Sequence, residues 1–179
     1  AVDPDGLLAE MVGRKLDPVS VACLYVPAAA RLLGEMWEAD RMSFIDVTLS
    51  TERLHRLVRQ VDTLVAEAQP SRGISALVLV SEAEQHTLGA LVLALQLRLA
   101  GVSATVRVAP LASDLSHLLT GGRFDLALIS LGCTAGLDSA AGLVRTLKLL
   151  SRGEICVFVG GAIPLDDAAL LVETGADRV

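Results

Sequence analysis

The chain has 179 residues, of which 53% are hydrophobic and 20% charged, enough for one compact core. Its formal net charge is −6, and the sequence shows no basic block or basic stripe, which argues against direct binding to nucleic acid or to an anionic membrane. Aromatic residues make up only 3%, so platforms for stacking nucleic-acid bases are not expected. A protein partner or a small ligand is favoured instead.

The segment from Asp3 to Glu67 has helical periodicity and predicts four short or medium helices. An acidic residue before a proline, at Asp3-Pro4 and Asp17-Pro18, is typical of a helix start, and Ser43 or Ser50 is expected to cap a later helix. The clearest apolar stripe, with spacings of three and four, is formed by Leu54, Leu57, Val58, Val61, Leu64 and Val65.

A stretch rich in proline, serine and glycine, Gln69 to Gly73, then interrupts the periodicity, as a linker does. We therefore predict a helical cap domain over residues 1–68, a linker over 69–74 and an α/β domain over 75–179.

Short strand-like runs alternate with helical stretches after the linker, which predicts parallel strands joined by helical crossovers. The strands, expected to be buried on both faces, are Ala76–Val80, Ala104–Val108, Leu126–Ser130 and Ile155–Val159. The helices are Gln85–Ala100, Leu111–Thr120, Ser139–Ser151 and Asp166–Thr174. Gly101, Gly121 and Gly153 are expected as left-handed C-caps. A fifth strand begins at Arg178, and the last helix of this flavodoxin-like fold is expected to be missing from the chain.

Three cysteines, Cys23, Cys133 and Cys156, are too few and too far apart for a disulfide framework or a zinc cluster. We expect a reducing, cytoplasmic location. No stretch is predicted to be long enough to span a bilayer, because the most apolar run, Leu88 to Leu99, is too short and is interrupted by polar residues.

The loops that follow the strands carry the candidate site residues, because ligands bind there in such sheets. His86 has a carboxylate two residues before it, Glu84, and a glycine three residues after it, Gly89, which suits a metal-ligating histidine with a fixed tautomer. A surface histidine with an ordinary acidic neighbour fits the same residues. The hydroxyls of Ser130 and Thr134 and the pair Gly160-Gly161 would leave room and hydrogen bonds for an inserted ligand tail. Ordinary turns explain these residues equally well.

Taken together, Glu84-x-His86-x-x-Gly89, Ser130 and Gly160-Gly161 after a helical domain resemble the cobalamin-binding fold, whose pattern is Asp-x-His-x-x-Gly, a serine motif and Gly-Gly. Gly34 to Thr48 and Arg53 to Leu57 resemble more closely the photosynthesis-gene antirepressors of the AppA, PpaA and AerR type, whose module has been described as sensing haem or cobalamin.

The resemblance implies a helical cap over a Rossmann-type sheet, with His86 as axial ligand to cobalt or haem iron. Glu84, Gly89, Ser130, Thr134, Gly160, Gly161 and Trp37 would contribute to cofactor binding. It also implies a repressor of the PpsR/CrtJ type as partner, and a flavin in an upstream domain of AppA-type proteins. Glu84 replaces the usual Asp, and its longer side chain is expected to move the carboxylate relative to the histidine.

Three other residues have simpler interpretations. Trp37 is not followed by the Glu-His pair found in light-sensing cobalamin repressors, and it fits a position in a helix core. His55 fits a solvated or partner-facing surface. His117 fits a packed helix position. No catalytic constellation is apparent, so we expect a chain without enzymatic activity, and the resemblance implies that it is a sensory antirepressor. A corrinoid carrier for a methyltransferase is the alternative, and a scaffold with a collapsed pocket is a third.

Overall fold

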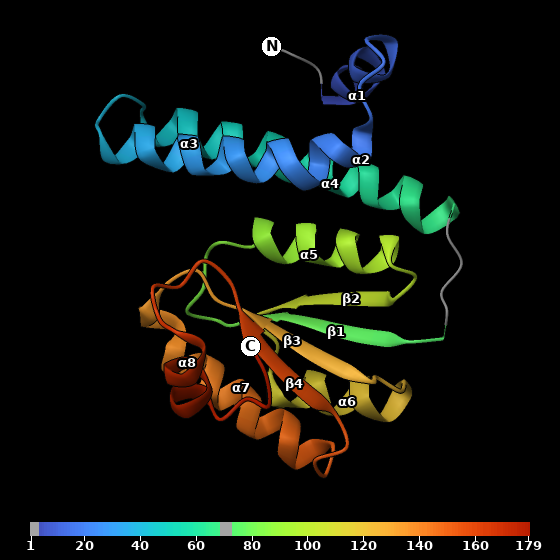
Figure 1. Ribbon diagram of the computed structural model, residues 1–179, viewed down its shortest axis with the longest axis vertical. Coiled ribbons are helices and arrows are strands. Elements are labelled where there is room, and N and C mark those ends of the chain that lie inside the picture. The colour runs from blue at the N-terminus through green and yellow to red at the C-terminus, as the bar shows by residue number, and fades with distance from the viewer. Residues whose placement is uncertain (1–3, 69–72) are drawn as a thin grey trace. The chain divides into compact units, whose positions relative to one another are not determined.

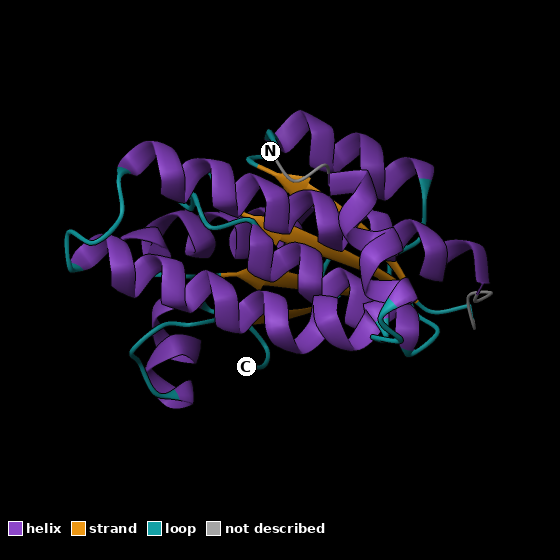
Figure 2. Cartoon of the chain, turned by 90° about the horizontal axis from the view of Figure 1, so that it is seen from above, coloured by secondary structure: helices purple, strands orange, loops and turns teal. Residues whose placement is uncertain are grey.

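The computed structural model describes residues 4–68 and 73–179, which form two compact units. The first unit comprises Ala1–Pro70 and Leu91–Leu99, and the second comprises Ser71–Ala90 and Ala100–Val179. Of the sequence predictions, the cap at Asp3 and most of the linker, residues 69–72, lie outside the described residues. Within the described residues, strands occur only in the second unit (Figure 2).

Four α-helices form the amino-terminal part of the first unit: α1 (Pro4–Gly13), α2 (Pro18–Ser20), α3 (Val26–Glu38) and α4 (Phe44–Ala68). The cap at Asp17 is confirmed, because its carboxylate accepts hydrogen bonds from the N–H groups of Val19 and Ser20. Ser43 caps α4 by accepting from the N–H of Asp46 at 3.2 Å. The alternative cap, Ser50, is wrong because α4 is longer than predicted and continues through it for 25 residues in all.

A π-helical turn, η1 (Val21–Tyr25), joins α2 to α3, so that the two helices are continuous. Pro27 explains the turn, since proline has no N–H to donate to the carbonyl of Cys23 four residues earlier. The N–H of Val26 instead donates to the carbonyl of Val21, five residues back, and both valines are buried.

The resulting helical run, Pro18–Glu38, corrects one prediction from the sequence. With 21 residues and an apolar composition it is long and apolar enough to cross a membrane, judged by length and composition alone. The sequence prediction missed it because the proline in its interior reads as a helix break.

The core of the first unit includes the inward face of α4, where Leu57, Val58, Val61 and Val65 are buried. Leu64, predicted in the same stripe, is 49% exposed. Residues Leu91–Leu99 of helix α5 (Leu88–Leu99) also belong to this unit, and Arg98 there forms an ion pair with Asp62 of α4.

The second unit contains a four-stranded parallel sheet in the order β2-β1-β3-β4 (Figure 1). Its strands are β1 (Ser75–Val80), β2 (Ser103–Val108), β3 (Leu126–Ser130) and β4 (Cys156–Gly160). The helices α6 (Ala112–Gly121), α7 (Leu137–Leu150) and α8 (Asp167–Thr174) follow β2, β3 and β4, and a short 3₁₀ turn, η2 (Thr134–Gly136), precedes α7. The predicted α/β fold with amino-terminal helices and a parallel sheet is confirmed.

All four strands were predicted to be buried on both faces, and of these only β1 is. β1, in the middle of the sheet, is buried on both faces, whereas β2 is an edge strand and largely exposed. In β3 and β4 the residues alternate between buried and half-buried, because only one face of these strands is fully covered. That covered face packs with α6, α7 and α8 in a core built around Leu79, Ile129 and Val159.

One helix end differs from prediction. Gly101 and Gly153 have the predicted left-handed conformation, and Gly175 has it after α8. Gly121 does not, since α6 includes it and the next residue, Gly122, is extended. Beyond α8, Arg178 forms a parallel bridge with Phe158 at the edge of β4, where the fifth strand was predicted.

Candidate functional site

The site lies at the carboxyl ends of β1 and β3, which are neighbours in the sheet although β2 lies between them in the sequence. The chain leaves β1 toward β2 on one side of the sheet and leaves β3 toward β4 on the other. The loops after the two strands therefore diverge, and a crevice at such a point is where ligands bind in open α/β sheets.

Glu84 joins the two loops through its carboxylate, and only 4% of the residue is exposed. Its Oε1 accepts hydrogen bonds at 2.7 Å from both the N–H and the ring Nδ1 of His86. Its Oε2 accepts a hydrogen bond at 2.5 Å from the N–H of Gly132, just beyond β3. The longer side chain that replaces the usual Asp thus still reaches the imidazole.

This hydrogen bonding determines the charge state of Glu84. Burial alone would raise the pKa of the carboxyl group, but the N–H groups of His86 and Gly132 and the imidazole outweigh it, and the pKa lies below its usual value of 4.5. An ionised carboxylate only accepts hydrogen bonds, so Nδ1 of His86 carries the proton. The lone pair is then on Nε2, and the side chain is 79% exposed to a ligand.

Glycine is required at Gly132 for this arrangement. A Cβ atom there would lie 2.9 Å from Oε2 of Glu84 and 3.2 Å from Nδ1 of His86. Gly132 was not among the residues predicted from the sequence, where its one signal is a glycine two residues after Ser130 at a strand end. No sequence periodicity indicates that it meets a carboxylate 48 residues away.

The last residues of three strands form one row across the sheet: Val80 pairs with Ser130, and Ser130 pairs with Gly160. A Cβ atom at Gly89 would lie 4.0 Å from Oγ of Ser130, so these two predicted residues are neighbours. A Cβ atom at Gly160 would meet no heavy atom within 4 Å. The structure therefore brings Gly89, Ser130 and Gly160 to one end of the sheet and leaves open space beside Gly160.

Gly161 has a different role from its neighbour. Its φ angle is +141°, and a Cβ atom there would lie 2.0 Å from the carbonyl oxygen of Leu131. It is thus required for the close approach of the loops after β3 and β4.

Other candidate residues lie outside this cluster. Thr134 is exposed at the start of η2. Trp37, on α3 of the first unit, is 52% exposed, so the interpretation of Trp37 as a core residue is wrong. His117, expected to be packed, is exposed on α6 because the buried face of that helix is centred on Leu115. His55 is half-buried, with Nδ1 3.0 Å from the carbonyl of Thr51. Within the described residues, no three His, Cys, Asp or Glu side chains gather as a metal site.

Comparison of this fold with solved structures identifies its class. It superposes on the Methanosarcina barkeri monomethylamine corrinoid protein with a TM-score of 0.67 and 19% identity, covering 96% of this chain and 82% of that protein. A cobalamin-binding protein from Desulfitobacterium hafniense DCB-2 gives a TM-score of 0.52 and 16% identity, covering 98% and 84%. The fold is that of cobalamin-binding proteins.

Sequence comparison defines the family within this class. No family model matches the chain. It is 43% identical over 161 residues to the 20.5 kDa protein in the bchF-crtJ intergenic region of Rhodobacter capsulatus, covering 89% of this chain and 84% of that protein. The chain belongs to the family of that protein.

Proposed function

We propose that the chain is a cytoplasmic, non-enzymatic sensory module that binds cobalamin through His86 and acts as an antirepressor by contacting a transcriptional repressor of the PpsR/CrtJ type. The observation that carries the ligand part is the hydrogen-bonded pair of Glu84 and His86 at the end of β1. A metal that brings most of its own ligands can take a single further ligand from the protein, and Nε2 of His86 could provide it.

The other residues at the strand ends fit such a ligand. Glu84 fixes the tautomer and orientation of the imidazole, and Gly132 lets the carboxylate approach. The open space beside Gly160 admits part of a ligand, and the half-buried hydroxyl of Ser130 can bond to it. When bound, cobalamin would be held by His86 and would supply a cobalt centre that can exchange ligands.

The repressor part of the proposal has separate support. The name of the 43% identical relative places its gene beside crtJ, and the sequence motifs resemble those of the AppA, PpaA and AerR antirepressors. If repressor binding changes the affinity of the chain for cobalamin by some factor, then cobalamin must change the affinity of the chain for the repressor by the same factor.

Titration of the purified chain with hydroxocobalamin tests the role of His86. The wild type is expected to give a spectral change on binding, and His86→Ala should abolish that change and weaken binding by about tenfold or more, because the axial nitrogen is lost. His117→Ala, which removes an exposed imidazole on α6, is the matched control and should leave both unchanged.

Two results would contradict this assignment. Equal spectra and affinities for the wild type and His86→Ala would remove His86 as the ligand. Binding of haem with His86-dependent spectra, without any binding of hydroxocobalamin, would replace the cobalamin assignment with haem.

A corrinoid carrier for a methyltransferase is a second candidate, favoured by the superposition of 96% of this chain on the monomethylamine corrinoid protein. A carrier should copurify with cobalamin and pass a methyl group to a partner enzyme. An antirepressor should retain a purified repressor of the PpsR/CrtJ type in a pull-down, and the amount retained should change with hydroxocobalamin. Absence of repressor binding together with methyl transfer would favour the carrier.

A further inference from the structure

The face of α4 opposite its buried residues is exposed along the whole helix. At 100° per residue, the buried residues centred on Val61 and Val65 place the solvent side half a turn away. We call this side the outer face of α4. Between Ile45 and Arg59 this side carries Ile45, Leu49, Glu52, Arg56 and Arg59, with Arg53 at its edge, and all six are exposed.

Three arginines bring positive charge to the carboxyl-terminal half of the outer face. No basic stripe was predicted from the sequence, but the helix places Arg53, Arg56 and Arg59 at successive spacings of three. Like charges at this spacing repel one another, which weakens the helix slightly. Among the described residues, none of the three guanidinium groups forms an ion pair or a side-chain hydrogen bond. The fold therefore gains no internal ion pair from them, in a chain whose net charge is −6.

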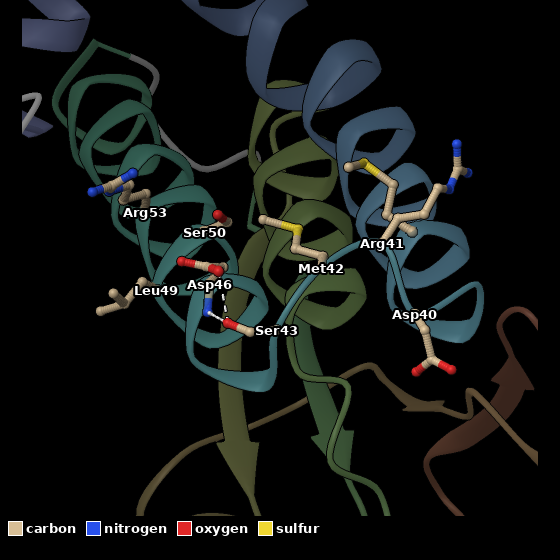
Figure 3. Close-up of a pocket in the computed structure, with 9 residues that line it drawn as sticks. Asp40, Arg41, Met42, Ser43, Asp46, Leu49, Ser50 and Arg53 are labelled. Atoms are coloured by element: carbon tan, nitrogen blue, oxygen red, sulfur yellow. Dashed lines mark hydrogen bonds between the residues drawn. The ribbon is translucent and has the colours of Figure 1, made fainter.

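The amino-terminal half of the same face is apolar. Ile45 is 67% exposed and Leu49 is 54% exposed. Leu49 also lines a hollow of about 780 Å³ between the end of α3 and the start of α4, whose apolar wall is completed by Met36 and Met42 and whose other lining residues are polar: Asp40, Arg41, Ser43, Asp46, Ser50 and Arg53. Figure 3 shows Leu49 and Arg53 projecting from the same side of α4. Methionine side chains adapt to differently shaped partners, so the apolar wall of this hollow can accept an apolar side chain.

We propose that the outer face of α4 is the surface that binds the repressor, and that its occupant is an amphipathic helix with an apolar end and an acidic end. This rests on the proposed function, which it deepens. From Ile45 to Arg59 the face is about 21 Å long, which matches a partner helix of about four turns. Apolar side chains of the partner pack on Ile45, Leu49 and the hollow, and its carboxylates pair with the arginines.

A protein helix fits this surface better than a nucleic acid. Three arginines would attract phosphates, but a phosphate backbone offers nothing to bury Ile45, Leu49 and the apolar wall of the hollow. The negative charge of the whole chain also opposes a nucleic acid.

Calorimetric titration with a purified repressor of the PpsR/CrtJ type tests the proposal on the full chain. The triple variant Arg53→Glu, Arg56→Glu, Arg59→Glu should bind about tenfold or more weakly, and so should Leu49→Asp. Wild-type affinity should fall between about 50 and about 300 mM salt, with a smaller fall for the triple variant. Arg145→Glu and Leu149→Asp on α7 make single substitutions of the same two kinds at exposed helix positions of the second unit and should bind like the wild type.

Circular dichroism melting and the hydroxocobalamin titration establish that the variants are folded, and each outcome is decisive. Failure of the wild type to bind the repressor contradicts the proposed function. Wild-type binding that the outer-face variants retain overturns this surface. The proposal is also overturned if the triple variant keeps repressor binding but loses binding to duplex DNA, which would assign the outer face to nucleic acid. Loss of self-association with repressor binding kept would assign the face to a second copy of the chain.

Discussion

Replacing Gly161 by alanine is expected to destabilise the protein by about 3 kcal/mol or more, or to prevent folding. A Cβ atom at this position would overlap the carbonyl oxygen of Leu131, 2.0 Å away, and the φ angle of +141° is rare for residues with a side chain. The obstacle is backbone of a neighbouring loop, so relief requires the loops after β3 and β4 to separate.

Gly160→Ala is the matched control because it adds the same methyl group one residue earlier, where no heavy atom lies within 4 Å. We expect its stability to remain within about 0.5 kcal/mol of the wild type, while hydroxocobalamin binding weakens because the methyl group occupies the open space. Urea denaturation of both variants measures the difference. Equal stability of the two would contradict the close approach at Leu131.

Replacing Glu84 by glutamine is expected to cost about 2 kcal/mol of stability and about tenfold or more in hydroxocobalamin affinity. Both carboxylate oxygens accept hydrogen bonds from N–H donors. In the glutamine variant the side-chain NH₂ group would replace one of these oxygens and would face an N–H donor. The imidazole of His86 would also lose the charged acceptor that fixes its tautomer. Glu82→Gln, at an exposed position in the same loop, should have little effect.

The contribution of Glu84 should depend on pH in one direction. Because its pKa in the folded protein is below the usual 4.5, the folded state binds this proton less readily than the unfolded chain. The stability difference between the wild type and Glu84→Gln should be complete above the unfolded pKa, about pH 4.5, and should decrease as the pH falls below it. Denaturation curves from pH 7 to about pH 3 measure it, and a constant difference would mean that Glu84 is not held ionised.

The order and type of the elements could be predicted from the sequence, because buried strands and amphipathic helices have different periods. The prediction of full burial failed for β2 because alternation within Ser103–Val108 does not reveal that the strand lies at an edge. The cap at Ser50 failed because a serine followed by apolar residues fits a helix interior as well as a helix start.

The sequence predicted which strand ends carry the candidate site, but it predicted contacts only between residues that are close in sequence. Glu84 and His86 are two residues apart, so their pairing follows from spacing. The role of Gly132 and the contact of Gly161 with Leu131 depend on which loops meet at the end of the sheet, which local patterns do not contain. The arginines of α4 were overlooked because two uncharged residues separate each from the next in the linear sequence.

The π turn at Val21–Tyr25 holds one residue more than a regular α-helical turn. In a regular α-helix, residues five apart point about 140° away from each other, yet Val21 and Val26 are both buried because the wide turn realigns them. Deletion of one residue from this turn would restore regular winding and place the two valines four residues apart, about 40° from each other, so both would stay on the buried side. A homologue lacking that residue should therefore keep the same buried side chains on either side of a regular helical turn.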